Sequence, residues 1–318
     1  MSKHNPLVSI MIPVFNREDY IGLAIASVLS QTYRNFELIV HDDASTDHSL
    51  AVIRQFHDSR LRVIHTSKNH GMLGGWNYLL KKARGEYLKQ MGSDDLLHPD
   101  CIAKEVKALQ DNPGVALVTC QRQVIGESGE PTKTFQFSDH TQVVSGTAHA
   151  HWILTTLREN KIGEPCATMF RRSVIARAGM FDPQFSQFAD FEYWIRILQF
   201  GDLLYLHEPL CSFRMHPGSN TTSAIRDGRF ISEIYTLIAK YYKDLPAVST
   251  TQSLQAGPFF VKNFSLTPTD YRHVLRQKTL DTLKNIKDLV LCGELSQSAR
   301  YLSRLVSVLI IESWQRKV

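Results

Sequence analysis

The chain has 318 residues, and its 43% hydrophobic content is enough for the core of one large domain or two smaller ones. Its net charge of +5 suits anionic partners such as nucleotides or lipid diphosphates, but the basic residues are too dispersed to indicate a nucleic-acid-binding protein. The first residues lack the pattern of a signal peptide, and no apolar run reaches the roughly 20 residues that span a bilayer. The five cysteines are scattered, with no CxxC pair, which fits reduced thiols, so we expect a cytoplasmic protein.

Strands and helices are predicted to alternate up to residue 125. Continuous apolar, β-branched runs indicate strands buried on both faces at residues 8–14 and 36–40, and shorter strands follow at residues 61–64, 87–91 and 116–125. Apolar residues three and four apart, or a capping sequence, predict helices at residues 21–29, 45–56, 74–83 and 102–109. This alternation is typical of βαβ units and predicts an α/β fold with a mainly parallel sheet.

The pattern changes after residue 125. Residues 126–147 are polar and rich in turn residues, so we expect either an excursion over the functional end of the sheet or a short hairpin. Helices are predicted at residues 172–179 and 189–200, and a strand at residues 203–206. The pattern is then helical, at residues 230–242, 271–291 and 295–314, so we place a domain boundary near residue 225.

Two adjacent carboxylates, Asp94 and Asp95, follow the strand predicted at residues 87–91. Carboxylates at the end of a buried strand are costly unless they meet a cation or hydrogen-bond donors, and ligands of α/β sheets bind at the carboxyl ends of strands. Hard oxygen ligands suit Mg²⁺ or Mn²⁺, which usually also hold substrate phosphates. The pair therefore predicts a metal site, and capping of the next helix is the alternative.

Polar residues also stand where the first two long strands end. The first strand leads into Pro13, Phe15, Asn16 and Arg17, and the second leads into Asp42, Asp43 and Ser45. Neighbouring parallel strands end at the same edge of a sheet, so these residues are expected at the same edge as Asp94 and Asp95. The ring of Phe15 can stack there on a nucleotide base, while a carboxylate accepts a hydrogen bond from an N–H group of the base. The chain has neither of the glycine-rich motifs that bind nucleotide phosphates, GxxxxGK[ST] and GxGxxG. The charge of a nucleotide diphosphate bound here must therefore be balanced by a metal ion. Helix capping by the two carboxylates is the alternative.

Two later segments carry further candidates. Asp190 stands at the start of a predicted helix, where the helix dipole favours a carboxylate, and an ordinary N-cap is the alternative. Glu192 and Arg196 form an i,i+4 pair that we expect to face outward or to brace the site. Arg214 and His216 alternate along an extended segment, so one can reach a diphosphate or a metal ion while the other packs; a surface turn is the alternative.

These residues, in this order, resemble those of the family 2 glycosyltransferases. The matching segments cover about residues 7–222 and lie at residues 8–16, 36–47, 68–77, 83–100, 179–196 and 213–220. The chain departs from the family pattern twice: many relatives have an aspartate where this chain has Gly92, and Ala189 replaces an acidic residue that often precedes the catalytic base. The residues from about 225 onward carry no part of the resemblance.

The resemblance implies the GT-A fold, a mainly parallel sheet flanked by helices with a Rossmann-like nucleotide-binding half, at residues 1–225, and a C-terminal helical extension at residues 226–318. It implies an inverting, metal-dependent enzyme whose donor is a nucleotide-diphosphate sugar, with a UDP-sugar favoured. The implied donor-binding residues are Pro13, Phe15, Asn16, Asp43, Asn69, Asn77, Ser93, Asp95 and Arg214. The implied ligands of Mg²⁺ or Mn²⁺ are Asp94, Asp95 and His216, and the implied general base is Asp190.

The expected acceptor is a hydroxyl group of a glycan or a lipid-linked molecule, in the synthesis of cell-surface polysaccharide or glycoconjugate. The alternatives are a nucleotidyltransferase and a nucleotide-sugar-binding protein without turnover. The helical residues 226–318 are expected to contact the acceptor, a second copy of the chain or the inner face of the membrane. Their apolar stripe, Leu302, Leu305, Val306, Leu309 and Ile310, suits an anionic bilayer, and packing on the catalytic domain or on a second copy is the alternative.

Overall fold

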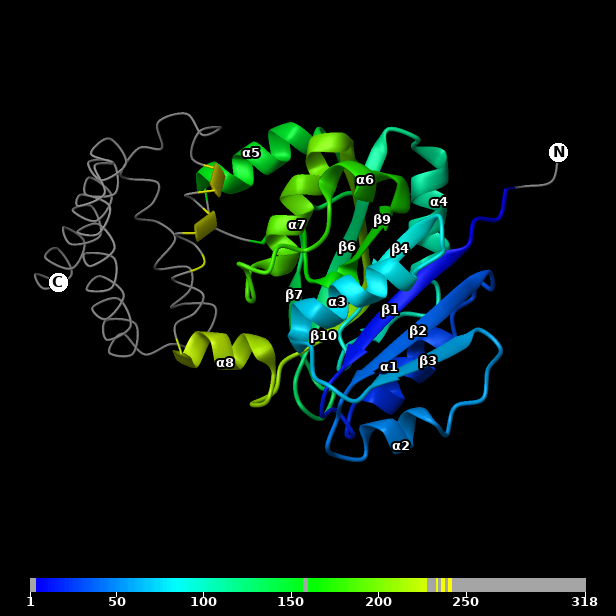
Figure 1. Ribbon diagram of the computed structural model, residues 1–318. Coiled ribbons are helices and arrows are strands. Elements are labelled where there is room, and N and C mark those ends of the chain that lie inside the picture. Colours follow the sequence, from blue (N-terminus) through cyan, green and yellow to red (C-terminus); the bar gives the residue numbers. More distant parts are fainter. Residues whose placement is uncertain (1–3, 157–159, 228–232, 234–235, 238–239, 242–318) are drawn as a thin grey trace, which may run out of the picture. The chain divides into compact units, whose positions relative to one another are not determined.

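The computed structural model describes residues 4–156, 160–227, 233, 236–237 and 240–241. The chain divides into two units, the first comprising Met1–Ala150 and Lys161–Ser219 and the second His151–Asn160 and Asn220–Val318. The first unit holds the sheet (Figure 1). The boundary predicted near residue 225 stays a prediction. The helices predicted at 271–291 and 295–314, with their apolar stripe, lie outside the described residues, as does most of the helix predicted at 230–242.

The first half of the sheet is parallel, as predicted. Its strands, in the spatial order β3-β2-β1-β4, are β1 Val8–Val14, β2 Phe36–Asp43, β3 Leu61–Thr66 and β4 Tyr87–Gln90. Because the four strands run in one direction, the segments that follow them meet at one edge, which we call the carboxyl rim (Figure 1). The predicted meeting of the strand ends is therefore confirmed.

The second half of the sheet is mixed. β9 Thr168–Arg171 lies between β4 and β6 Val115–Ile125 and is antiparallel to both. β10 Asp202–Arg214 is parallel to β6, so both of these strands also end at the carboxyl rim. Three short antiparallel strands complete the described sheet, β5 Leu96–Leu97, β7 Pro131–Phe135 and β8 Gln142–Val144. β7 pairs with β6, which confirms the hairpin expected after residue 125.

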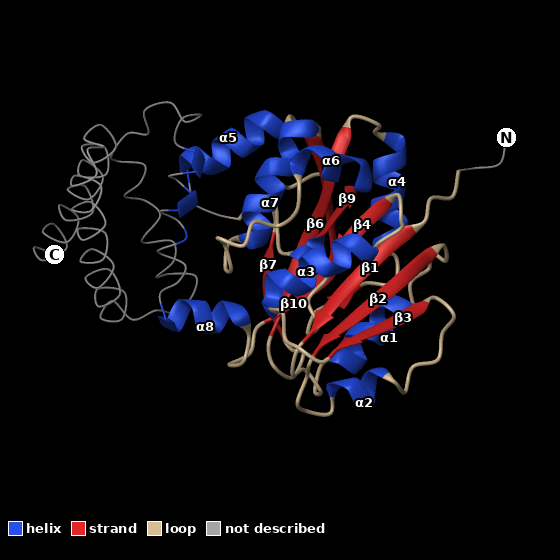
Figure 2. Ribbon diagram, in the orientation of Figure 1, coloured by secondary structure: helices blue, strands red, loops and turns tan. Residues whose placement is uncertain are grey.

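Helices flank the sheet, as Figure 2 shows. In the first unit they are α1 Ile21–Leu29, α2 Ser49–Ile53, α3 Gly71–Lys82, α4 Cys101–Asp111, α6 Ile175–Ala178 and α7 Ala189–Ile197. The other described α-helices are α5 Gly146–Thr156, which begins in the first unit, and α8 Asn220–Asp227, which belongs to the second. Short 3₁₀ helices lie at Pro165–Ala167, Arg172–Val174 and Leu198–Phe200. None of the helices within the described residues has the length and apolar character that crossing a bilayer requires.

The alternating side chains of β1 explain why helices pack on both faces. Ile10 belongs to a core that it shares with Ile25 of α1 and Ile102 of α4, and none of the three is exposed. On the other face, the Cβ of Pro13 lies 3.7 Å from the position that a Cβ would take at Gly75 of α3. Successive residues of a strand point to opposite faces, so β1 is buried on both, as its continuous apolar run predicted.

Strand β10 is longer than predicted. The strand expected at residues 203–206 stops before Pro209, but β10 continues to Arg214. Its register against β6 shifts on both sides of Pro209. Because proline cannot donate to the ladder of a sheet, a local irregularity of this kind accommodates it within a strand. The additional residues carry Arg214 to the carboxyl rim.

Helix α2 begins at Ser49, not at the predicted Ser45, and ends at Ile53. Of the residues expected to cap it, Asp47 accepts from the Ser49 main-chain N–H (2.9 Å) through Oδ1, whereas Ser45 and Thr46 make hydrogen bonds to the segment after β1. Ser45 Oγ accepts from the Asn16 main-chain N–H (3.1 Å), and Asn16 Oδ1 accepts from the Thr46 main-chain N–H (2.8 Å). These reciprocal bonds hold the segment after β2 against the segment after β1 at the carboxyl rim.

Two residues other than glycine have a left-handed backbone at this rim. Asn16, just after β1, has a φ of 53°, and Ala44, directly after β2, has a φ of 62°. Asparagine tolerates this conformation, whereas alanine loses roughly 1–2 kcal/mol in it. Such strain persists only where surrounding contacts impose it, and it is typical of binding sites.

We expect Ala44→Gly to raise the free energy of unfolding by about 0.5–1 kcal/mol, because relief of the strain exceeds the entropy that glycine adds to the unfolded chain. Gly71→Ala is the matched control. Gly71 has a φ of 73° and open space around an added Cβ, so this variant should lose about 1 kcal/mol. Urea unfolding measures both, and a less stable Ala44→Gly variant would contradict the strain.

Candidate active site

The segments after β1 and β2 place an aromatic ring and a carboxylate at the carboxyl rim. Phe15 is 45% exposed, so its ring is accessible for stacking, and Pro13 lies two residues earlier in β1. Asp43 is buried, and its carboxylate accepts hydrogen bonds from Thr66 Oγ1 (3.2 Å), from the His70 main-chain N–H (2.8 Å) and from His70 Nδ1 (2.7 Å). The carboxylate is therefore held rigidly in place.

Two histidines around Asp43 were not selected from the sequence. His41, Asp43 and His70 each offer one ligand-type atom within 4.8 Å of the others, and they are the one such group among the described residues. His41 Nε2 lies 3.8 Å from Asp43 Oδ1, and the His41 ring lies 4.9 Å from that of Tyr78. Burial lowers the pKa of His41, which favours a neutral ring. His41 and His70 do not have the sequence spacing of a metal-binding motif, so the sequence did not indicate that they lie together. The fold brings both of them to Asp43.

The predicted amide residues hold backbone segments in place. Asn69 Oδ1 accepts from the Gly71 main-chain N–H (2.7 Å) at the start of α3. Asn77 of α3 donates to the main-chain oxygen of Phe181 and accepts from its N–H, both at 2.9 Å. Together with the bonds of Asn16, these contacts fix the segments around the rim. Direct contact of the three amides with a donor stays a prediction.

Asp94 and His216 are brought together although they are far apart in the sequence. Asp94 Oδ2 lies 3.0 Å from His216 Nε2 and 3.8 Å from Arg17 Nε. The Asp94 side chain is 17% exposed, and Ser93, in the same loop, is buried. Asp94 and His216 therefore have the proximity that the metal-site prediction requires. Arg17 is an additional cation here, and the sequence pattern placed it at the end of the first strand without giving it a role.

The second carboxyl group of the pair, on Asp95, is directed into the protein and is 3% exposed. Its Oδ1 accepts from the Arg214 main-chain N–H (3.0 Å), and it also meets the thiol of Cys166. Burial and the charge of Asp94 raise the pKa of Asp95 well above its usual range. These contacts join the loop after β4 to the end of β10, and the role of Asp95 as a metal or donor ligand stays a prediction.

Gly92 leaves the space of its missing side chain to these two carboxyl groups. A Cβ at Gly92 would lie 2.6 Å from Asp95 Oδ2 and 2.8 Å from Asp94 Oδ1. Both separations are shorter than real Cβ contacts. The loop is therefore built around a glycine, and an aspartate at this position requires the two carboxyl groups to move.

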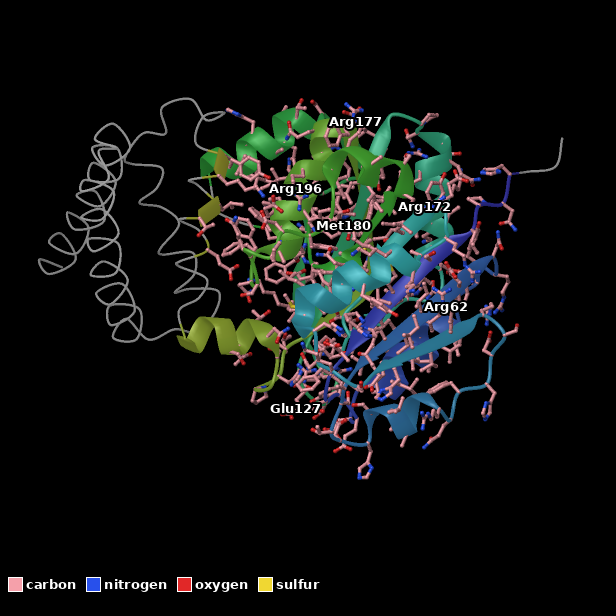
Figure 3. All side chains as sticks on the ribbon, viewed as in Figure 1. Arg62, Glu127, Arg172, Arg177, Met180 and Arg196 are labelled. Atoms are coloured by element: carbon pink, nitrogen blue, oxygen red, sulfur yellow. The ribbon has the colours of Figure 1, made fainter. Side chains whose placement is uncertain are left out.

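Arg214 packs inside the protein, while His216 faces Asp94. Arg214 is 2% exposed; its Nε donates to the Asp94 main-chain oxygen (2.9 Å), and its Nη1 donates to those of Gly126 (3.0 Å) and Glu127 (2.9 Å). Figure 3 shows Glu127 beside the strand ends. As expected, one of the two residues, Arg214, packs inside while the other, His216, faces the site. Contrary to the expected alternation, both contact the loop that carries Asp94. His216 is only 8% exposed, which argues against an ordinary surface turn.

Asp190 is the second residue of α7 and is partly exposed. It is not the N-cap, a position that Phe188 takes, and its Oδ1 accepts from the Phe191 main-chain N–H (2.7 Å). Burial raises the pKa of Asp190 to about 7; this hydrogen bond opposes the shift, and the charge of Glu164 adds to it. An accessible carboxyl group that ionises near neutral pH suits a general base.

Two partly buried ion pairs lie in this part of the protein, and the charges of one of them, Arg122–Glu164, act on the Asp190 carboxyl group. Arg196 donates through Nε and Nη2 to the buried Glu192, both at 2.8 Å, so this pair braces α7 and the outward orientation is wrong (Figure 3 labels Arg196). Arg122 of β6 pairs with Glu164, whose charge contributes to the raised pKa values of both Asp95 and Asp190. The Arg122–Glu164 pair was not predicted, because its two members stand in segments with no recognisable motif.

The Asp94–His216 pair fits two adjacent ligands of a divalent cation. Its oxygen and nitrogen atoms are 3.0 Å apart, and neighbouring ligands in an octahedron with bonds of about 2.1 Å are separated by about 3 Å. Carboxylate oxygen and imidazole nitrogen are both accepted by Mn²⁺ and similar ions. The donor set is therefore suitable, with water or a ligand completing it.

Comparisons with known proteins agree with one another. The sequence model described as "Glycosyl transferase family 2" matches residues 9–179. An uncharacterized glycosyltransferase of Rickettsia typhi is 29% identical over 225 residues, which is 70% of this chain and 68% of the relative. S. aureus TarS 1–349 in complex with UDP-GlcNAc is 18% identical, with a TM-score of 0.65 and coverage of 98% of this chain and 91% of that chain.

A second solved structure is mannosyltransferase PcManGT from Pyrobaculum calidifontis in complex with GDP-Man and Mn²⁺. It is 18% identical, with a TM-score of 0.56, and the match covers 98% of this chain and 88% of that chain. At such identities the two structures show a shared fold. They confirm the predicted GT-A fold, with a mainly parallel sheet flanked by helices.

We expect Gly92→Ala to lower the free energy of unfolding by about 1–3 kcal/mol, because the added Cβ must displace the carboxyl groups of Asp94 and Asp95. Gly114→Ala is the control, since a Cβ there meets only Asp202 Oδ2, at 4.0 Å. Urea unfolding measures both variants. A Gly92→Ala variant as stable as Gly114→Ala would show that these carboxyl groups do not pack over Gly92.

Proposed function

The chain belongs to glycosyl transferase family 2, and from this premise we propose that it is an inverting enzyme that moves a sugar from a UDP-sugar to a hydroxyl group of a glycan or lipid-linked acceptor. The observation that carries the proposal is the pairing of Asp94 with His216 at the carboxyl rim. The same unit contains Asp190, whose carboxyl group has a raised pKa of about 7. TarS with bound UDP-GlcNAc and PcManGT with GDP-Man and Mn²⁺ support the donor class.

The donor base binds in this proposal between Phe15 and Asp43. The exposed ring of Phe15 stacks on the base. Asp43 Oδ2 accepts one hydrogen bond within the described residues, from the His70 N–H, and a carboxylate oxygen can accept two. A base N–H, such as that of uracil, therefore finds an acceptor whose position is already fixed by its protein contacts.

Asp190 takes the proton of the acceptor hydroxyl group as this group attacks the anomeric carbon. Its raised pKa makes it a stronger base than an exposed aspartate, while a substantial part remains ionised at neutral pH. The Arg122–Glu164 and Glu192–Arg196 pairs hold the surrounding segments in place.

Asp94 and His216 would hold Mg²⁺ or Mn²⁺, with Asp95 as the third proposed ligand. When bound, such an ion neutralises the charge that develops on the departing nucleoside diphosphate. Asn16, Asn69, Asn77 and Arg214 position the donor site, because their hydrogen bonds organise the loops that line the rim. Ser93, in the loop of Asp94, would contact the donor.

The product is a cell-surface polysaccharide or glycoconjugate, made in the cytoplasm or at the inner face of the membrane. Residues 226–318 contact the acceptor, a second copy of the chain or the membrane, and they lie almost entirely outside the described residues.

A panel of nucleotide-sugars tests the proposal directly. The purified chain is incubated with UDP-, GDP- and dTDP-sugars, with Mn²⁺ or with EDTA, and released nucleoside diphosphate is measured together with the melting temperature. We expect release from a UDP-sugar and a raised melting temperature with UDP. Binding without release from any donor would favour the non-catalytic alternative, and a triphosphate-dependent reaction would favour a nucleotidyltransferase.

We expect Asp190→Asn to lower kcat roughly 10²–10⁴-fold while leaving the affinity for UDP unchanged, because the base is lost but the donor site is not. In the wild type, kcat/KM should fall as the pH is lowered through about 7, since the base must be ionised. Asp111→Asn, which removes a carboxylate from the exposed end of α4, is the control. Normal turnover by Asp190→Asn would refute the base assignment.

A further inference from the structure

Arg17 is held between the segments that follow β1 and β10. Its Nη1 donates to the main-chain oxygen of Asn16 (2.8 Å), and its Nη2 donates to that of Gly218 (3.0 Å). Its Nε lies 3.8 Å from Asp94 Oδ2, and its side chain is 20% exposed. The guanidinium group is therefore fixed at the candidate metal site while part of it remains accessible.

Among the contacts that fix Arg17, the ion pair with Asp94 is the one with a charged group. Its two hydrogen-bond acceptors are neutral carbonyl groups, and 3.8 Å from the Asp94 carboxylate is beyond hydrogen-bond distance. These bonds use two of the five N–H groups that a guanidinium carries. A planar, always charged group with further donors matches the oxygens of a phosphate.

The loop that carries Asp94 presents few carboxylates to the candidate metal site, so a further cation can contribute to donor binding. Gly92 carries no carboxylate, and the side chain of Asp95 is buried, so Asp94 is the carboxylate of this loop that faces the cations. A metal ion bound here would have fewer anionic ligands than a site with a further aspartate would supply. Arg17 supplies a fixed positive charge next to Asp94 and does not have to be recruited from solution.

We propose that Arg17 binds the diphosphate of the donor directly, so that the chain holds a nucleoside diphosphate even without a divalent cation. This inference rests on the proposed function, because it assigns a further residue to the same donor site. Arg17 also joins the loops that carry Asn16 and His216, which places its guanidinium where the diphosphate would meet the ion.

Calorimetric titration of the full chain with UDP and with uridine, in EDTA and in Mn²⁺, tests the proposal. We expect the wild type to bind UDP in EDTA and Arg17→Gln to bind it roughly tenfold to a hundredfold more weakly, with uridine binding unchanged. Mn²⁺ should reduce the difference. Arg172→Gln is the control, because Arg172 is an exposed arginine next to β9, away from the strand ends (Figure 3).

Unchanged UDP binding by Arg17→Gln in EDTA would overturn the inference, as would a wild type that binds UDP only with Mn²⁺. Equal weakening of UDP and uridine would also overturn it, because Arg17 would then hold the loops and not the diphosphate. A wild type that binds UDP under neither condition would refute the proposed UDP donor as well. If Arg17→Gln fails to fold, Arg17→Lys carries the test, since a point charge replaces the planar fork and UDP binding should still weaken selectively.

Discussion

The buried guanidinium of Arg214 is the contact on which the geometry of the carboxyl rim depends. It donates to the main-chain oxygens of Asp94, Gly126 and Glu127, and so joins the loops that follow β4 and β6 to the end of β10. A buried carbonyl left without a donor costs about 1–3 kcal/mol, so the three strand ends are stable together in one arrangement. Asp94 and His216 are neighbours because this arrangement puts them there.

A second buried charge supports the strand from which the acidic loop emerges. Lys89 of β4 pairs with Glu105 of α4 at 2.7 Å, neither side chain is exposed, and Lys89 Nζ also donates to the main-chain oxygen of Thr168 (3.2 Å). Such a pair adds little net stability, but removing one member leaves an uncompensated charge. The pair therefore ties β4 to the helix on one side and to β9 on the other, and limits the movement of the loop that follows.

The two adjacent carboxyl groups have different roles, one in the structure of the loop and one at the site. Asp95 lies inside, where its carboxyl group joins the loop to β10, and Asp94 lies at the rim beside Arg17 and His216. Both carboxyl groups pack over Gly92, which leaves no room for a further side chain there. The absence of a side chain at this position is therefore part of the packing of the loop, and the cations around Asp94 belong to the same arrangement.

The sequence by itself determined the parallel half of the sheet and the gathering of polar strand ends at one rim, because continuous apolar runs and their spacing act locally, and parallel strands must end on the same side. The family resemblance likewise followed from short motifs in order. Tertiary structure decided the rest: that Asp95 is buried and Asp94 is not, that Arg214 packs while His216 faces the site, that Ser45 bonds to Asn16 instead of capping a helix, and that β9 enters the sheet. The direction in which a loop side chain points depends on its contact partners, and these can be distant in the sequence, as Asp94 and His216 are. The residues next to it in the sequence therefore do not identify these partners.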